Sequence, residues 1–419
     1  MGKTISEKIL SLRSGVDAYA GRIVEAEVDY VMVSDITGPI AFREFDQLGT
    51  EPKRNKIVLI PDHYVPNKDV ASAEQAKEMR EFAKRHKIKN YFEVGKSGVC
   101  HQIMVDEGFA APGRLIVGAD SHTCTYGGLG AFSTGIGSTE AAAVFATGRL
   151  WFKVPETIKV EVTGSFKRYV GGKDLILQII KDIGVDGATY KAFEFSGPGI
   201  KNISVSDRLT VANMAIEAGG KAGIFPCDDL TREYIRDTVK GEYKAVDADK
   251  DAKYSQILKY DLSRLEPMVA FPFLPENGRP VREADVKIDQ AYLGSCTNGR
   301  IEDMRIAAEV VKGRKVADGV RFIVVPASPK VYRQMLDEGL FRIFLDAGAF
   351  ISGPTCGACL GGYMGILADG EKAISSTNRN FIGRMGHKGS EVYLAGPAVV
   401  AASAVTGRIC TPDAPEGRR

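Results

Sequence analysis

The sequence predicts a soluble α/β protein of three domains built on mainly parallel sheets, and three observations point to this class. Its 419 residues are enough for two or three ordinary hydrophobic cores. Hydrophobic residues make up 44% of the chain and charged residues 26%, which is typical of a soluble globular protein. Short apolar runs alternate with amphipathic segments in the first and last thirds of the chain, as in α/β folds.

Charge and cysteine usage narrow the class further. Lysine and arginine number 55 against 53 acidic residues, and a net charge of +2 argues against a nucleic-acid partner. No apolar run approaches the roughly 18 residues that span a bilayer, and the N-terminus lacks a signal-peptide core. The seven cysteines are odd in number and spread along the chain, unlike a secreted disulfide framework. We therefore expect a cytoplasmic protein with reduced thiols and no membrane partner.

The first region, residues 1–152, is predicted to be an α/β domain whose helices begin at capping boxes. Thr4 with Glu7 opens the first helix. Ser72 with Gln75 is predicted to open a second helix, which runs to Ile88 and carries its apolar residues on one face.

Two predicted strands of this region, residues 56–61 and 114–118, run directly into an acid and a histidine. In open α/β sheets, ligands bind beyond the carboxyl ends of the strands. An imidazole held by a carboxylate keeps one tautomer and a raised pKa, which suits it to protonate a leaving hydroxide. A structural, hydrogen-bonded histidine is about as common as a catalytic one, so both interpretations stay open. The residues are Asp62 with His63, Asp120 with His122, and His101 after a glycine-containing turn.

The second region, residues 153–282, has a different pattern of apolar and polar residues and is predicted to be a second α/β domain. Residues 157–162 and 192–195 are expected to form strands, and residues 174–183 a helix. A further helix over residues 207–218 is predicted to be capped by Ser206 and stopped by Gly219 and Gly220. Four prolines between Pro267 and Arg282 mark the boundary to the next region.

The third region, residues 283–419, again alternates short apolar runs with amphipathic segments, as the first region does, and is predicted to be a third α/β domain. Strands are expected over residues 288–293, 321–326 and 349–352, and one helix over Pro329–Phe344. Two glycine-rich loops that carry cysteines follow the first and last of these strands. The loops are therefore expected at the same edge as the acid–histidine pairs if the domains face one another.

These loops contribute three cysteines, Cys296 from one and Cys356 with Cys359 from the other, and we infer that they hold an iron–sulfur cluster. A fully ligated structural site would want four protein ligands, whereas three thiolates on a four-iron cube leave one iron open to act as a Lewis acid. The spacing alone also allows a zinc site or a dithiol redox pair. On spacing alone, the relative odds of a cluster, a zinc site and a redox pair are about two to one to one.

Two arginines, Arg379 and Arg384, lie five residues apart in a polar segment near the C-terminus. Together they could clamp a carboxylate group bidentately. An arginine pair that forms salt bridges on the surface is an equally good interpretation of the spacing.

Taken together, the motifs resemble those of the aconitase superfamily, and most closely the large subunits of its two-subunit 3-isopropylmalate dehydratases. They follow the order of that family from about residue 60 to residue 385. The matching stretches are residues 61–63, 98–102 and 118–123, Glu194 with residues 197–199, and residues 294–298, 353–361 and 376–383.

The resemblance implies an aconitase-like large subunit of three α/β/α domains around a cluster cleft. It implies a [4Fe–4S] cluster on Cys296, Cys356 and Cys359. It also implies the pairings Asp62 with His63, Asp120 with His101 and Glu194 with His122, and substrate contacts from Ser121, Asn378, Arg379 and Arg384.

The reaction implied is the dehydration of a 2-hydroxy di- or tricarboxylic acid and its rehydration at the neighbouring carbon, as between 2- and 3-isopropylmalate in leucine biosynthesis. Single-chain aconitases carry a fourth, swivelling domain that this chain lacks before Arg419. We therefore expect a separate small subunit that supplies it. A homoaconitase or related large subunit is the nearest alternative, and a zinc-binding or redox scaffold protein is the alternative from another class.

Overall fold

A computed structural model describes residues 2–413, so Met1 and the last six residues of the predicted third region lie outside the described part. The chain divides into two compact units. Unit 1 comprises Met1–Ser165 with Asp186–Leu262, and unit 2 comprises Phe166–Val185 with Ser263–Arg419. The division into three domains near residues 152 and 282 stays a prediction. In the described part of the chain, no helix has both the length and the apolar character needed to cross a bilayer.

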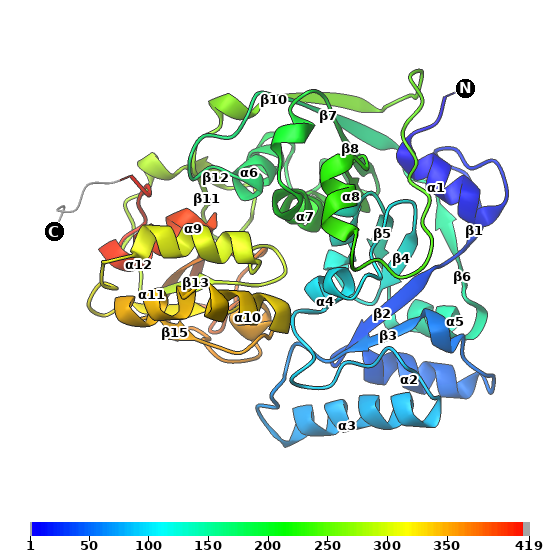
Figure 1. Cartoon of the computed structure of the whole chain (residues 1–419), viewed down its shortest axis with the longest axis horizontal. Helices are drawn as coiled ribbons and strands as arrows, with labels where there is room; N and C mark the ends of the chain where they lie inside the picture. The colour runs from blue at the N-terminus through cyan, green and yellow to red at the C-terminus, as the bar shows by residue number, and fades with distance from the viewer. Residues whose placement is uncertain (1, 414–419) are drawn as a thin grey trace. The chain divides into compact units, whose positions relative to one another are not determined.

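Unit 1 contains a parallel four-stranded sheet in the order β3-β2-β4-β5, with β2 at Tyr30–Ser34, β3 at Ile57–Ile60, β4 at Leu115–Gly118 and β5 at Phe132–Gly135. All four strands are almost entirely buried, as expected for a parallel sheet covered on both faces. Helices on one face include α2, α3 and α5, at Gly38–Gln47, Val70–Arg85 and Ser138–Thr147 (Figure 1). The other face packs against α4, at Cys100–Asp106, and the 3₁₀ segment η2, at Ser121–Leu129.

A second parallel sheet of unit 1 has the order β10-β7-β8-β9, with β7 at Thr157–Thr163, β8 at Ala192–Ser196, β9 at Ala222–Ile224 and β10 at Gln256–Asp261. The 3₁₀ segment η4, at Met214–Ala218, follows helix α7 directly. Strands β1 and β6, at Ile23–Glu27 and Arg149–Lys153, form a separate antiparallel pair. The remaining helices of the unit are α1 at Ile5–Ser14, α7 at Val205–Asn213 and α8 at Asp229–Ile235.

Unit 2 is built on a seven-stranded sheet in the order β12-β11-β17-β16-β13-β14-β15, which is parallel from β17 to β15. Helices α9 to α12 share one apolar core with it, and α6 packs on β11 and β12. The strands are β11 Met268–Ala270, β12 Gly278–Pro280, β13 Gln290–Leu293, β14 Arg321–Val324, β15 Phe350–Ile351, β16 Lys372–Ser375 and β17 Glu391–Ala395. The helices are α6 Gly172–Ile183, α9 Ile301–Val311, α10 Pro329–Asp337, α11 Leu340–Ala347 and α12 Pro397–Thr406.

The predicted strands are confirmed with small shifts at their ends, but two predicted helices differ in extent. The helix predicted over residues 207–218 is α-helical only to Asn213 and continues as η4. The capping box of Thr4 with Glu7 is present, but α3 begins one turn early because Asp69, with Ser72, forms its capping box. Helix α7 is capped by Ser204, not Ser206. The single helix predicted from Pro329 is two helices, since Gly339 adopts φ 71° between α10 and α11.

Candidate functional site

Three carboxylates of unit 1 lie together because each follows a strand of the same parallel sheet. Asp35 comes directly after β2, Asp62 follows β3 by one residue, and Asp120 follows β4 by one residue. The strands are adjacent in the order β3-β2-β4, so their carboxyl ends meet at one edge. That edge is the ligand-binding edge of an open α/β sheet.

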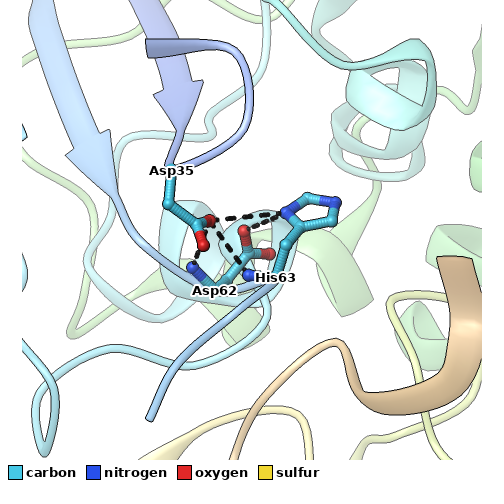
Figure 2. A group of neighbouring side chains, drawn as sticks. All are labelled: Asp35, Asp62 and His63. Carbon is cyan, nitrogen blue, oxygen red and sulfur yellow. Dashed lines mark hydrogen bonds and ion pairs between the residues drawn. The ribbon is translucent and has the colours of Figure 1, made fainter. Parts of the chain in front are cut away.

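Two of these carboxylates, Asp35 and Asp62, lie near the same ring nitrogen of His63. Nδ1 of His63 lies 2.6 Å from Oδ1 of Asp62 and 3.7 Å from Oδ1 of Asp35, and Figure 2 shows both carboxylates near this nitrogen. Backbone N–H groups of Asp62 and His63 both donate to Oδ1 of Asp35 at 3.0 Å, which fixes the loop after β3. Although burial alone would lower it, the two carboxylates raise the pKa of His63 well above its usual value. His63 is thereby held as an imidazolium.

The same three residues have the geometry of a cation site, because their ligand atoms all lie within 4.8 Å of one another. Several of their acceptor sites are already in use, however. Asp35 accepts three backbone N–H groups, including that of Tyr64, and Oδ2 of Asp62 accepts the N–H of Cys100. A protonated His63 offsets one of the two carboxylate charges, and its contacts with both acids make the set an acid–histidine network.

The third carboxylate, Asp120, is the point on which three imidazoles converge. Its Oδ1 lies 2.9 Å from Nε2 of His101 and 3.6 Å from Nδ1 of His122, and its Oδ2 lies 4.0 Å from Nε2 of His63. Tyr126 Oη, 2.9 Å from Nδ1 of His101, orients that ring from the other side. Burial opposes the charge of Asp120, but its bonds to His101 and His122 hold its pKa well below the usual value. The predicted pairing of Asp120 with His101 is therefore confirmed, as is that of Asp62 with His63.

The predicted pairing of Glu194 with His122 is wrong. Nε2 of His122 lies 2.8 Å from Oε1 of Glu217, a buried residue of η4. Glu194, on β8, instead accepts the N–H of Ile5 at 2.8 Å and the hydroxyl of Tyr254. It thus satisfies an otherwise unpaired donor in the first turn of α1, and its place among the catalytic residues stays a prediction. Burial raises the pKa of Glu194.

The cysteines of unit 2 stand in loops that follow strands β13 and β15. Cys296, Cys356 and Cys359 are all buried. Left-handed backbone at Ser295, with φ 76°, and at Gly357, with φ 62°, turns both loops sharply. A side chain at position 357 would collide with the hydroxyl of Tyr292, so the close approach requires glycine there.

Neighbouring polar groups show that the three sulfurs share one environment. Nδ2 of Asn378 donates to Sγ of Cys296 at 3.3 Å, and Sγ of Cys359 lies 3.6 Å from Oδ1 of the same amide. The hydroxyl of Tyr292 donates to the carbonyl of Cys356 at 3.1 Å. Burial, followed by the charges of all three cysteines, raises the pKa of Tyr292 well above its usual value. The cysteines predicted to act together are thus brought together within unit 2.

Two basic side chains, of Arg300 and Lys173, donate hydrogen bonds to backbone carbonyls in and next to these loops. The guanidinium of Arg300 donates to the carbonyls of Cys296 and Thr297 at 2.8 and 2.6 Å. Nζ of Lys173, on α6, donates to the carbonyls of Ser376 and Thr377 at 2.9 and 2.6 Å, just before Asn378. Burial lowers the pKa of Lys173 to about 7, against the opposing charges of Cys296 and other acidic groups.

The other predicted substrate contacts, Ser121, Arg379 and Arg384, are partly exposed residues near the acid–histidine network or the cysteine loops in sequence. Ser121 follows Asp120 directly and is partly exposed. Arg379 and Arg384 are both half-buried in the loop after β16, and the guanidinium of Arg379 lies 5.9 Å from the ring of Phe381. Their role as a carboxylate clamp stays a prediction.

Known proteins resemble the chain over nearly its whole length. A model of the aconitase family (aconitate hydratase) matches residues 7–285 and 277–407. The chain belongs to the aconitase family. The 3-isopropylmalate dehydratase large subunit of Thermodesulfovibrio yellowstonii is 56% identical over 417 residues, 99% of each chain. That of Moorella thermoacetica is 55% identical over 419 residues, again 99% of each chain.

Among solved structures, the holo-form of Thermococcus kodakaraensis aconitase X matches with a TM-score of 0.51 over 89% of each chain. At 15% identity this likeness supports the fold alone. The predicted family and its α/β fold are confirmed.

Dehydratases of the aconitase family generally depend on an iron–sulfur group, and the residues of unit 2 fit one. All three cysteines are buried, and two of the sulfurs contact the amide of Asn378. The charges of all three act on the phenol of Tyr292, and thiolates are the ligands that hold iron–sulfur clusters.

Six residues that the structure places at these sites were not predicted from the sequence: Asp35, Tyr126, Lys173, Glu217, Tyr292 and Arg300. Asp35 could have been found, because it follows a buried apolar strand as Asp62 and Asp120 nearly do. Glu217 is the only charged residue between Leu209 and Gly220 and so stands out in an apolar run. Tyr126, Lys173, Tyr292 and Arg300 carry no comparable sequence signal.

Proposed function

We propose that the chain is the large, catalytic subunit of a 3-isopropylmalate dehydratase, which interconverts 2- and 3-isopropylmalate in leucine biosynthesis. The observation that carries the proposal is the identity of 55–56% to such subunits across 99% of both chains. The acid–histidine network and the grouped cysteines supply the chemistry that a hydro-lyase needs.

The cofactor proposed is a [4Fe–4S] cluster on Cys296, Cys356 and Cys359. Such a cluster, bound by three thiolates, supplies Lewis acidity toward a hydroxyl that must leave. Asn378 would orient two of the three ligand sulfurs through its amide. Arg300 would hold the Cys296 loop in its left-handed conformation through two backbone carbonyls.

The histidines would manage protons and water. His63, kept protonated by Asp62 and Asp35, is suited to donate a proton to a departing hydroxide. His101 and His122 share Asp120, and each has a second partner that fixes its ring, Tyr126 or Glu217. Glu217 takes the role that the sequence had assigned to Glu194. Ser121, Asn378, Arg379 and Arg384 would contact the substrate, the arginines through its carboxylates.

The partner proposed is a separate small subunit that carries the swivelling domain and completes the site. The relatives are themselves named large subunits, which supports this composition. The seven cysteines form no disulfide in the part of the chain that the structure describes, and this supports a reducing compartment such as the cytoplasm.

The test is anaerobic purification of the chain and reconstitution with candidate small subunits, followed by turnover of isopropylmalate, homoaconitate and citrate. We expect a brown protein that bleaches in oxygen, turns over isopropylmalate best, and catalyses poorly without the small subunit. Preference for homoaconitate would replace the substrate and keep the reaction class. A colourless protein with one zinc would refute the proposal.

A further inference from the structure

A recess in unit 1, separate from the acid–histidine network, is lined by residues from the end of β5, the start of α5 and β6. Figure 1 labels these three elements. Its cavity volume is about 50 Å³ and it opens to solvent, so a ligand would be enclosed only in part. The residues that define its chemistry are Glu140, Trp151, Lys153, Tyr190 and Lys221.

Two lysine ammonium groups of the recess lie near the ring of Tyr190. Nζ of Lys153 and Nζ of Lys221 lie 5.8 and 5.3 Å from the centre of the Tyr190 ring. In the described part of the chain, neither ammonium has a carboxylate oxygen within 4.0 Å. Lys221 is partly buried, and burial lowers its pKa. A partly desolvated ammonium with no carboxylate in ion-pair contact favours an anionic ligand.

A carboxylate lines the same recess. Oε2 of Glu140 accepts the N–H of Gly137 at 2.8 Å and so caps α5, which leaves its other oxygen available. Its charge acts on Lys221, yet the two form no ion pair within 4.0 Å. The recess therefore presents both signs of charge, held apart.

Aromatic rings supply the apolar surface between these charges. Trp151 is 57% exposed and Tyr190 is 40% exposed, which is high for such large rings. Tyr190 also has φ 59°, a left-handed conformation that costs a residue other than glycine about 1–2 kcal/mol. Strain of this kind persists where the surroundings hold it and is concentrated at ligand sites.

We propose that this recess binds a free α-amino acid with an apolar side chain. The carboxylate of the ligand would lie at Lys153 and Lys221, its ammonium at Glu140, and its side chain against Trp151. A zwitterion satisfies both signs of charge at once, whereas a phosphate ester would be repelled by Glu140. The inference does not depend on the reaction proposed above.

Trp151 is the only tryptophan of the chain, so its fluorescence reports binding at this recess directly. The full-length protein is titrated with L-leucine, with 3-methylbutanoate, which lacks the ammonium, and with 3-methylbutylamine, which lacks the carboxylate. We expect a saturable change with L-leucine in the millimolar range and at least about tenfold weaker binding of both analogues.

Two variants test the two charged walls separately. Lys221→Met and Glu140→Gln should each weaken L-leucine binding at least about tenfold, and glutamine at position 140 still accepts the Gly137 N–H. Lys159→Met is the matched control, because Lys159 also lies over a tyrosine ring but is paired with Glu161 at 3.0 Å. It should bind L-leucine as the wild type does.

Circular dichroism checks that each variant is folded, and a misfolded variant is replaced by Lys153→Met, which changes an exposed side chain. No saturable change with L-leucine up to about 20 mM would overturn the inference. So would equal binding of either analogue, or wild-type affinity in both charge variants.

Discussion

The acid–histidine network of unit 1 and the cysteine loops of unit 2 are both placed at the carboxyl ends of parallel strands, but they are held in different ways. In unit 1 the functional side chains bind one another, as in the contacts of Asp120 with His101 and of His122 with Glu217. In unit 2 the cysteine sulfurs touch an amide, while Arg300 and Lys173 bind the backbone around them.

This difference indicates which of the two sites is held in place by paired charges. The network of unit 1 is a set of paired charges, so loss of one member leaves another buried without compensation. The loops of unit 2 are shaped by backbone conformation and by contacts to their carbonyls. Substitutions should therefore have distinct signatures in the two units, and four of them test this from the largest expected effect to the smallest.

The largest effect is expected from Cys356→Ser in unit 2. A hydroxyl is a poor substitute for a thiolate ligand, so the variant should lose the cluster and all measurable activity. Visible absorption of anaerobically purified protein measures the cluster. Cys227→Ser, at a buried cysteine of unit 1, should retain it, and equal cluster content in both variants would remove the ligand assignment.

In unit 1, Glu217→Gln should lower kcat by about 10²–10⁴-fold, because His122 loses the carboxylate that fixes its ring and supports its charge. Glu194→Gln is the matched control, since that carboxylate binds Ile5 and Tyr254 instead. Its kcat should stay within a few-fold of the wild-type value. Equal losses in the two variants would restore Glu194 to the catalytic set.

The charge pairing around His63 should make the stability of unit 1 depend on pH. The raised pKa of His63 means that its ion pair contributes fully below about pH 6.5 and is lost as pH rises through the raised value. Despite burial, His63 lowers the pKa of Asp35, so that carboxylate is charged throughout this range.

Asp35→Asn should therefore destabilise the protein more at about pH 6 than at about pH 9. Denaturant unfolding of both proteins at the two pH values measures the difference. A destabilisation that is independent of pH would show that Asp35 acts only by accepting hydrogen bonds from uncharged backbone N–H groups.

The smallest effect is expected from Lys173→Met in unit 2. The substitution leaves the carbonyls of Ser376 and Thr377 buried without this donor, at a cost of about 2 kcal/mol. The thermal midpoint should fall by about 5 °C. Lys181→Met changes an exposed lysine of the same helix and should leave the midpoint unchanged.

The elements that the sequence predicted well are those with strong local patterns. Buried strands such as β3 and β4 consist of consecutive apolar residues, and the box of Thr4 with Glu7 is a contact within one turn. The errors arose where two local patterns compete. Ser204 and Ser206 both fit a cap before α7, and only the backbone conformation of Ser204 decides between them.

The candidate site divides in the same way. By itself the sequence determined the family, the positions of the acids and histidines at strand ends, and the three cysteines as a group, since these follow from residue type and spacing along the chain. Only the tertiary structure decided that His122 is paired with Glu217, 95 residues away, and that Lys173 lies beneath Ser376 and Thr377. Such partners are set by how helices pack on sheets, and packing brings together residues whose separation along the chain carries no signal.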